Sequence, residues 1–317
     1  MARQWRRAIK LTVSSDGKKL DLSNLRVTFR IEQKTLQHPN VAYVRVYNMS
    51  REHSTWAKTL KEGGKLVLEA GYEDNIGVLF RGEIKQVESG RESPTDTYVK
   101  FAAAEGDRGY NKATVNKTLK AGSTAKDVVD EAVKALKKYD LKDGKMPKDV
   151  FEKMKYPRPF VMYGMARDYL RYIDNTFSTM WSIQKDRIDI VKSKEGPEEG
   201  DTVILNSRTG LIGRPIQESN GGILARALIN PKFDVNQKVK IDEASVERAD
   251  MNLTYTGDKF NALPYLPPVA ADGLYWIASI TWIGDSRGTA WYADLECNAM
   301  SQPSLTKGQI ARGISPS

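Results

Sequence analysis

The chain has 317 residues, and because a single hydrophobic core stops growing at roughly 250–300 residues, this length predicts two or three domains. Hydrophobic residues make up 40% of the chain and charged residues 28%, a balance that excludes a mainly disordered or collagen-like protein. The formal net charge of +9 permits acidic partners without identifying one, and the single cysteine, Cys297, excludes an intrachain disulfide.

The N-terminal residues and the apolar runs argue against secretion and membrane insertion. Met1 to Arg7 are basic, but neither an apolar segment nor a small-residue cleavage site follows them, so we expect no secretory signal. The most apolar stretch, from Leu274 to Gly284, is far shorter than the roughly 20 residues needed to span a bilayer. We therefore expect a protein that folds in the cytosol and has no membrane partner.

Alternating hydrophobic residues predict strands throughout residues 8–105. Residues 25–31 and 41–47 alternate between apolar and polar side chains, as a strand with one buried face requires. A short helix is expected to begin at Ser54 as its N-cap and to end before Gly63. Further strands are expected at residues 65–72, 78–87 and 98–103. This order predicts a small barrel or sandwich, which we place in a first domain at residues 1–110.

Residues 111–200 change to helical periodicity. One helix is expected to begin after Ser123 or Thr124, because the hydrophobic residues that follow recur every three to four positions. A second helix is expected near residues 165–175, and residues 181–191 have the pattern of a tight hairpin. We therefore predict a small α+β unit in this part of the chain.

The run from Lys194 to Gly200 is rich in Glu, Gly and Pro and predicts a linker. After this linker the strand pattern resumes, which places a second β domain at residues 201–300. Its strands are expected at residues 203–205, 210–216, 222–228, 235–241, 274–283 and 289–297. Residues 301–317 are polar and predict a flexible C-terminal tail.

The sequence around each possible catalytic or cofactor-binding motif does not support that function. Gly284 to Gly288 matches G-x-S-x-G, but a nucleophile elbow needs a helix after it and a later histidine, whereas a predicted strand follows here. We interpret the motif as a hairpin turn. His38 and His53 lie apart and lack neighbouring ligands, so we expect no metal site. Walker A and dinucleotide-binding sequences are absent, and none of the acidic pairs stands out, so we expect neither catalytic residues nor cofactors.

The basic charge is concentrated in the N-terminal arm and in residues 111–160, which hold 13 Lys/Arg against 7 Asp/Glu. The helix predicted between Lys126 and Lys138 also carries acidic residues near its start. Acidic residues at the start and lysines at the end are what the helix dipole favours. Stacking aromatic residues do not accompany these lysines, so a solvated helix face is favoured over a nucleic-acid groove.

Three segments of the chain, taken in order, form a recognisable set. The first comprises Val44 to Ser50, the short helix, Gly64 to Tyr72 and Leu79 to Ile84. The second is the helix after Ala121-Gly-Ser-Thr-Ala-Lys-Asp-Val-Val together with Trp181-Ser-Ile-Gln. The third runs from Leu205 to Gln217 and continues through Ala227 to Pro231 and Val239 to Asp242. In this order the three segments resemble the baseplate hub proteins of contractile-tailed bacteriophages, the late-control protein D group. The proteins of a non-phage contractile injection system would share the same pattern.

The resemblance implies a mainly β fold with an α+β insertion, in which two tail-tube-like β-barrel domains flank a small helix-plus-hairpin unit. It implies a homotrimeric hub in the virion tail baseplate, made in the host bacterial cytoplasm, with the tail tube protein above and the spike protein below. Three chains with two barrels each would present a six-fold ring to the tube and a three-fold end to the spike. Phage DNA would pass through the channel without specific binding.

The two ends of the chain lie outside the resemblance and are the candidate partner contacts. We expect Trp5, Arg6 and Arg7 in the arm and Ile310 and Ile314 in the tail to contact baseplate wedge, sheath-side or neighbouring tail proteins. The lysine-bearing face of residues 126–137 is expected to point away from the channel, because a strongly basic wall would retain DNA.

Other functions remain open at this point. Another tube-fold tail protein, such as a distal tube or tail-completion protein, is the nearest alternative. A tail-associated peptidoglycan hydrolase and a DNA-binding protein are alternatives from other classes.

Overall fold

The computed structural model describes residues 6–15, 17–60, 63–193, 196–197, 200–217, 222–241 and 273–300. The chain forms a first β region, a middle unit and a second β region. The first β region contains β1 (Arg7–Ser15), β2 (Lys18–Asp21), β3 (Val27–Lys34), β4 (Val41–Tyr47), α1 (Arg51–Lys58), β5 (Lys65–Tyr72), β6 (Asn75–Arg91) and β7 (Thr97–Ala104). The middle unit contains α2 (Asp107–Lys112), β8 (Thr114–Leu119), α3 (Ala125–Lys137), β9 (Lys142–Asp143), β10 (Phe160–Met165), α4 (Ala166–Phe177), β11 (Thr179–Gln184) and β12 (Arg187–Lys192). The second β region contains β13 (Thr202–Leu205), β14 (Leu211–Gln217), β15 (Ile223–Leu228), β16 (Lys238–Ile241), β17 (Leu274–Asp285) and β18 (Trp291–Ala299).

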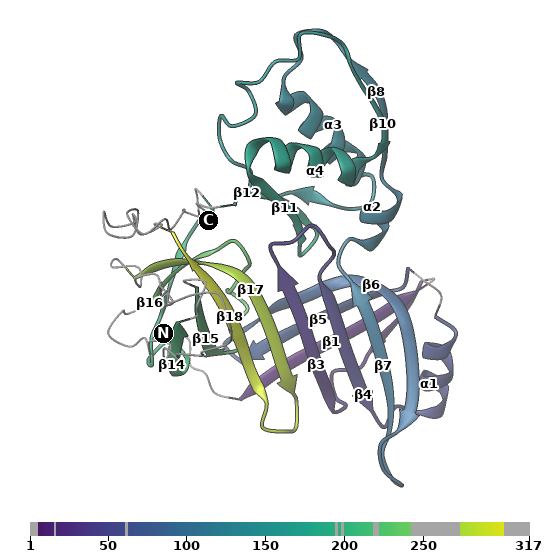
Figure 1. Ribbon diagram of the computed structural model, residues 1–317. Helices are drawn as coiled ribbons and strands as arrows, with labels where there is room; N and C mark the ends of the chain where they lie inside the picture. The colour runs from purple at the N-terminus through teal and green to yellow at the C-terminus, as the bar shows by residue number, and fades with distance from the viewer. Residues whose placement is uncertain are drawn as a thin grey trace, which may run out of the picture.

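The strands of both β regions belong to one continuous sheet. Its main path runs β14-β15-β18-β17-β3-β4-β7-β6-β5-β1-β2, with β16 paired to β17 and β13 paired to β16. The two regions meet at the antiparallel pair β3–β17, where seven residues from Ser279 to Asp285 pair with Lys34 to Thr28. Figure 1 shows this seam, with β17 and β18 beside β3 and the middle unit above the sheet. The first predicted domain limit, after residue 110, falls inside α2.

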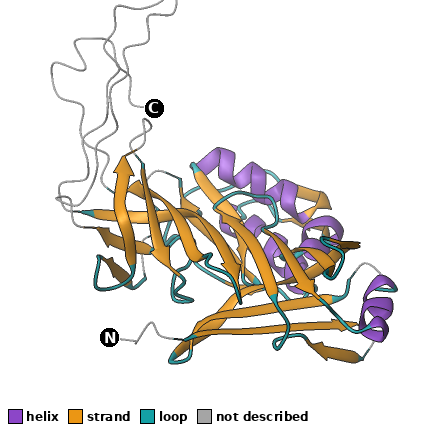
Figure 2. Cartoon of the chain, turned by 90° about the horizontal axis from the view of Figure 1, so that it is seen from below, coloured by secondary structure: helices purple, strands orange, loops and turns teal. Residues whose placement is uncertain are grey.

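One hydrophobic core serves both β regions, and a second core serves the middle unit. Buried side chains from β1, β3 and β5 share a cluster with Trp282 of β17 and Trp291 of β18. In the middle unit α3 and α4 each bury one face around Trp181 of β11. Each fully buried large apolar side chain contributes about 1.5–3 kcal/mol to stability. Figure 2 shows that strands make up most of the molecule, so the prediction of a mainly β fold with an inserted helical unit is confirmed.

The second β region repeats the strand connectivity of the first. In the first region β3 pairs with β4, β4 with β7, β7 with β6 and β6 with β5. In the second region β14 pairs with β15, β15 with β18, β18 with β17 and β17 with β16. The strands therefore correspond in chain order: β3 to β14, β4 to β15, β5 to β16, β6 to β17 and β7 to β18.

The correspondence extends to a bulge in the long strand of each region. The register of β6 against β7 shifts between Ile84 and Gln86, and the register of β17 against β18 shifts between Ile277 and Ser279. In both regions the long strand leaves its own neighbour, β5 or β16, close to this bulge. A bulge bends a strand and changes its direction. The long strands β6 and β17 therefore bend at corresponding positions.

An arginine and a tyrosine occupy matching places in the two registers. When the bulges are aligned, Arg45 of β4 corresponds to Arg226 of β15, and Tyr98 of β7 corresponds to Tyr292 of β18. The Arg45 guanidinium lies 4.4 Å from the Tyr98 ring centroid, and that of Arg226 lies 4.2 Å from Tyr292. The same cation–π contact therefore closes the same corner of both regions.

The short helix of the first region begins one turn earlier than predicted. α1 starts at Arg51, because the hydroxyl of Ser50 accepts the backbone N–H of His53 at 3.2 Å and so caps the first turn. The prediction of Ser54 as N-cap is therefore wrong. For α3 the expected start is confirmed, since Thr124 forms a capping box with Asp127.

The sequence patterns missed the pair β8–β10 in the middle unit. Only Val115 and Leu119 of β8 are buried, so a mostly polar segment gave no clear alternation. Its partner β10 lies beyond α3, and the ladder runs from Phe160 opposite Leu119 to Met165 opposite Thr114. Backbone pairing with a distant segment therefore determines this strand, more than its own side chains.

Candidate functional site

The motif that resembles a nucleophile elbow is a hairpin turn, as expected. Asp285 ends β17, its N–H donates to Ala290 O at 2.8 Å, and β18 follows at Trp291. The hydroxyl of Ser286 accepts the backbone N–H of Val27 at 2.9 Å, so it ties the turn to β3. Within the described ranges no group of three His, Cys, Asp or Glu side chains is arranged to hold a metal ion. None of the described helices is both long and apolar enough to cross a membrane.

The arm residues predicted to contact partners divide into two kinds. Arg6 is exposed, with its guanidinium 3.6 Å from Glu73. Arg7 contacts the β17–β18 turn: its guanidinium donates to the carbonyl oxygens of Gly288 and of Thr289 at 3.1 Å, and it lies 5.4 Å from the Trp291 ring centroid. Arg7 therefore fastens the N-terminal strand to the second β region. Trp5, Ile310 and Ile314 lie outside the described residues.

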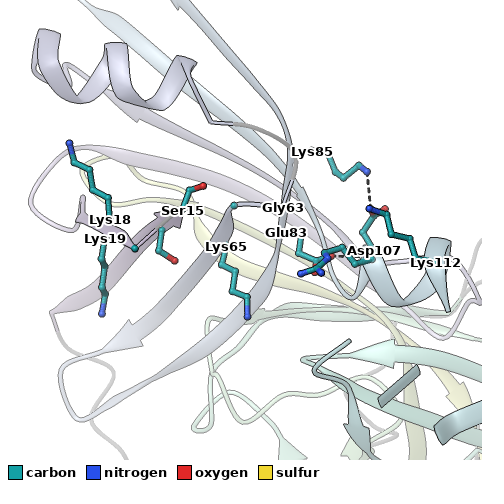
Figure 3. A pocket seen from close by; sticks show the side chains of 13 residues that line it. Ser15, Lys18, Lys19, Gly63, Lys65, Glu83, Lys85, Asp107 and Lys112 are labelled. Carbon is teal, nitrogen blue, oxygen red and sulfur yellow. Dashed lines mark hydrogen bonds and ion pairs between the residues drawn. The ribbon is translucent and has the colours of Figure 1, made fainter. Parts of the chain in front are cut away.

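A basic hollow of about 650 Å³ opens between the β1–β2 turn, the start of β5 and α2 (Figure 3). Its lining includes six cationic side chains, Lys18, Lys19, Lys65, Lys85, Arg108 and Lys112. Two carboxylates oppose them: Asp107 lies 2.8 Å from Lys85, and Glu83 accepts the N–H of Arg108 at 2.8 Å. Burial raises the pKa of Glu83. The surplus of positive charge suits a surface that meets an acidic partner.

A buried polar cluster around Glu105 joins three parts of the molecule. The carboxylate accepts hydrogen bonds from Gln33 Nε2 at 3.2 Å, Asn40 Nδ2 at 2.8 Å and the backbone N–H of Lys185 at 3.1 Å. Gln33 comes from β3 and Lys185 follows β11, so Glu105 links the first β region to the middle unit. Trp282 Nε1 donates to Gln33 Oε1 at 2.8 Å and adds the second β region. Burial raises the pKa of Glu105 to about 7.

A charged contact at Asp234 links the middle unit to the second β region. Arg187 of β12 donates to one carboxylate oxygen of Asp234, and Lys185 Nζ lies 3.6 Å from the other. Burial opposes ionisation, but these two cations outweigh it and lower the pKa of Asp234. Lys145 Nζ also donates to the carbonyl oxygen of Asn236, so several charges meet along one seam. These contacts hold the middle unit against the second β region, although Asp234 Oδ1 and Arg187 Nε have no hydrogen-bond partner among the described residues.

Several strand edges of the sheet have no strand partner within the described part of the chain, and two of them lie at the end of β6 and along β14. β5 pairs with β6 only as far as Glu83, and Ile84 bonds to Gly63 and Gly64, so residues 86–91 pair with β7 on one side only. Among the described strands β14 stands at one end of the sheet and has β15 as its strand partner. Unpaired strand edges are templates for pairing with another chain. Both edges are therefore candidate assembly surfaces.

Solved structures of tail proteins have the same fold as this chain. The 43 kDa tail protein of prophage MuSo2 from Shewanella oneidensis superposes with a TM-score of 0.56 at 9% identity, covering 92% of this chain and 97% of that one. A tail protein from Neisseria meningitidis MC58 gives 0.55 at 9% identity, with 92% and 96% covered. An Escherichia coli protein, described as a component of the type VI secretion system with structural similarity to the T4 bacteriophage tail proteins gp27 and gp5, gives 0.53 at 12% identity, with 92% and 79% covered. Neither a family model nor a curated protein matches the sequence. The chain therefore has a tail-protein fold.

Sequence patterns did not point to the polar contacts at Glu105 and Asp234. The chain has 40 acidic residues, and neither of these two stands in a recognisable motif. Asn40 precedes β4 and Glu105 follows β7, and polar residues are common at the ends of strands. A long-range contact map would have identified them, because their partners lie in other parts of the fold.

Proposed function

We propose that the protein is a structural component of a phage tail baseplate, a homotrimeric hub that adapts a six-fold tail tube to a three-fold spike. The observation that carries the proposal is the repeated strand connectivity of the two β regions within a chain of tail-protein fold. A chain with two similar modules presents six modules when three copies assemble. The same trimer keeps three-fold symmetry in every part that occurs once per chain, such as the middle unit.

The partners follow from this arrangement. The tail tube protein would meet the ring of six modules, and the spike would meet the three-fold end, while DNA passes through the channel without specific binding. The basic hollow beside α2 supports an acidic partner on the wedge or sheath side. We assign Trp5, Arg6, Ile310 and Ile314 to contacts with neighbouring tail proteins, and Arg7 to anchoring the arm.

The stoichiometry of the purified chain tests this proposal. Native mass spectrometry should give a trimer, since the adaptor needs three copies of two modules. A hexamer would favour the alternative of another tube-fold tail protein, and a chain that stays monomeric at all concentrations would contradict the hub. A zymogram on peptidoglycan should show no clearing, and clearing would favour a tail-associated hydrolase.

Localisation in the particle separates a phage baseplate from another contractile injection system. Solved structures of the same fold come from prophages and from a type VI secretion component. An image of the assembled particle should place the chain in the virion tail, between tube and spike. Finding the chain in the capsid or outside the tail axis would contradict the proposal.

A further inference from the structure

Part of the lining of the basic hollow beside α2 is made of small residues and main chain. Gly17 in the β1–β2 turn and Gly63 before β5 have φ angles of +79° and +106°, which residues with a side chain rarely adopt. A Cβ added at either glycine would meet nothing within 4 Å, so open space lies in front of both turns. Ser14, Ser15 and Gly64 complete this neutral part of the lining. A chain segment from another protein can therefore approach the backbone here.

The six cations of the hollow divide by whether this chain already neutralises them. Three have a carboxylate beside them: Lys18 and Glu52 at 3.9 Å, Lys65 and Asp140 at 3.3 Å, and Lys85 and Asp107 at 2.8 Å. The other three, Lys19, Arg108 and Lys112, are exposed and make no ion pair within the described part of the chain. These three charges are therefore available to groups outside the chain.

The three available cations stand on two sides of the hollow. Lys19 belongs to β2, whereas Arg108 and Lys112 are four residues apart on α2, which places their side chains on one face of the helix. Figure 3 shows Lys19 and Lys112 on opposite sides, with Glu83 between them. The Glu83 carboxylate accepts the Arg108 N–H at 2.8 Å and so holds the start of α2 against β6. A ligand that contacts both sides must carry at least two separated negative charges.

The lining favours an acidic peptide over a nucleic acid. The residues that line the hollow include no aromatic side chain, on which the bases of a single strand would stack. Glu83 and Asp107 also line it, and they would repel a phosphate backbone, which carries a charge at every nucleotide. A peptide carries charge only at its acidic side chains, so its neutral residues and backbone N–H groups can lie beside these two carboxylates.

We propose that the basic hollow binds an acidic, extended segment of a different tail protein, with carboxylates of the segment on Arg108 and Lys112 at one side and on Lys19 at the other. The inference rests on the proposed function, because it places other tail proteins beside this chain. The Arg108 guanidinium can bond both oxygens of one carboxylate, whereas the two lysines act as point charges. A second copy of this chain is a poor occupant, since each copy has a net charge of +9.

Binding of fluorescein-labelled hexaglutamate to the full chain tests the charge preference by fluorescence anisotropy. We expect saturable binding that weakens as NaCl rises from about 50 to about 300 mM, because salt screens exposed charges. Labelled hexaserine is the uncharged control and should not bind. Labelled hexathymidylate should bind more weakly than hexaglutamate, and tighter binding of this oligonucleotide would overturn the preference for a peptide.

Charge-changing variants test whether the peptide binds in the hollow. We expect Lys19→Glu, Arg108→Glu and Lys112→Glu each to raise the dissociation constant of hexaglutamate at least about tenfold. Lys153→Glu changes the net charge equally at an exposed residue outside the hollow, and should raise it less than about twofold. Glu83→Gln keeps an acceptor for the Arg108 N–H but removes a negative charge, so it should tighten binding about threefold. Circular dichroism and thermal unfolding report whether each variant folds.

The outcomes separate this inference from the proposed hub. Equal weakening by Lys153→Glu and by the three variants of the hollow would show general charge attraction and overturn the site. Because Lys19 and Lys112 lie on different elements, the loss of one variant to misfolding leaves the other as a test. A chain that forms trimers in native mass spectrometry but does not bind hexaglutamate overturns the site and leaves the hub proposal standing. A monomeric chain that binds the peptide in the hollow contradicts the hub and leaves the acidic-segment site standing.

Discussion

The two β regions share a strand plan but differ at the places where each meets its surroundings. The connection from β4 to β5 contains α1, whereas residues 229–237 join β15 to β16 without a helix. β1 pairs antiparallel with β5, whereas β13 pairs parallel with β16. The backbone ladder and its bulge occur in both regions, whereas the helix α1 and the pairing direction of the added strands β1 and β13 differ. Strand connectivity is therefore the feature that the two β regions share. The helix α1 and the partners of β5 and β16 are the features in which they differ.

Matching positions in the two long strands carry different side chains, which gives the sharpest test of the comparison. Trp282 is fully buried at the internal seam, stacked on Phe233 with ring centroids 6.3 Å apart. We expect Trp282→Ala to lower the free energy of unfolding by about 3–5 kcal/mol, since it leaves a large cavity and an unpaired Gln33 oxygen. Ser89→Ala at the matching position is expected to change it by less than about 0.5 kcal/mol. Urea denaturation measures both, and similar losses would contradict the correspondence.

The end of β7 differs from the end of β18 in the same way. Aligned by register, Glu105 corresponds to Ala299, so at this position the first region carries a buried carboxylate that docks the middle unit and the second region carries an alanine. Burial raises the pKa of Glu105 from 4.5 to about 7, so the native state binds the proton more tightly than the unfolded chain between these values. The free energy of unfolding should therefore fall as pH rises through this window, by roughly 3 kcal/mol at most.

The variant Glu105→Gln isolates this effect. Urea denaturation from pH 4.5 to 8 should show that the wild type loses stability relative to Glu105→Gln as the pH rises. Glu88→Gln, at an exposed position on β6, is the control and should keep the wild-type slope. Parallel curves for the wild type and Glu105→Gln would show that the carboxylate is not destabilised by burial.

The paired arginines give the smallest expected effect. Arg226 bonds both oxygens of Asp294, at 2.7 and 3.1 Å, and lies over Tyr292, whereas Arg45 makes one ion pair with Glu92 at 3.1 Å and lies over Tyr98. Both side chains are partly exposed, so we expect each change to alanine to cost about 1 kcal/mol or less. Arg226→Ala should cost slightly more, because its fork bonds both carboxylate oxygens. A larger loss for Arg45→Ala would contradict this ranking.

Sequence patterns predicted the parts of the fold that local chemistry determines. Alternation identified β3 and β4, periodicity and a capping threonine identified α3, and turn residues identified the hairpins. The seam between β3 and β17 was not predictable, because each strand looks like an ordinary half-buried strand and the pairing joins distant segments. The resemblance implied two similar β domains, but their residue-by-residue alignment could not be read from the sequence, since it lies mainly in connectivity and register and shared residues such as Arg45 and Arg226 stand far apart in the chain.

The candidate surfaces were predictable only in part. The basic character of the arm was visible in the sequence, but the engagement of Arg7 with the β17–β18 turn depends on the folded position of that turn. The open edge of β6 requires knowing where β5 ends its pairing, at Glu83. An edge is a property of the sheet as a whole, so the sequence of the edge strand does not reveal it.

The ladder between β3 and β17 also has a mechanical consequence. Seven consecutive residue pairs bridge the two β regions, and Arg26 adds an ion pair to Asp285 at 2.7 Å. Tension across this seam is shared by many bonds at once, so the seam between the two β regions resists opening. Bending under load would then fall to the loops and, in the proposed trimer, to the contacts between copies.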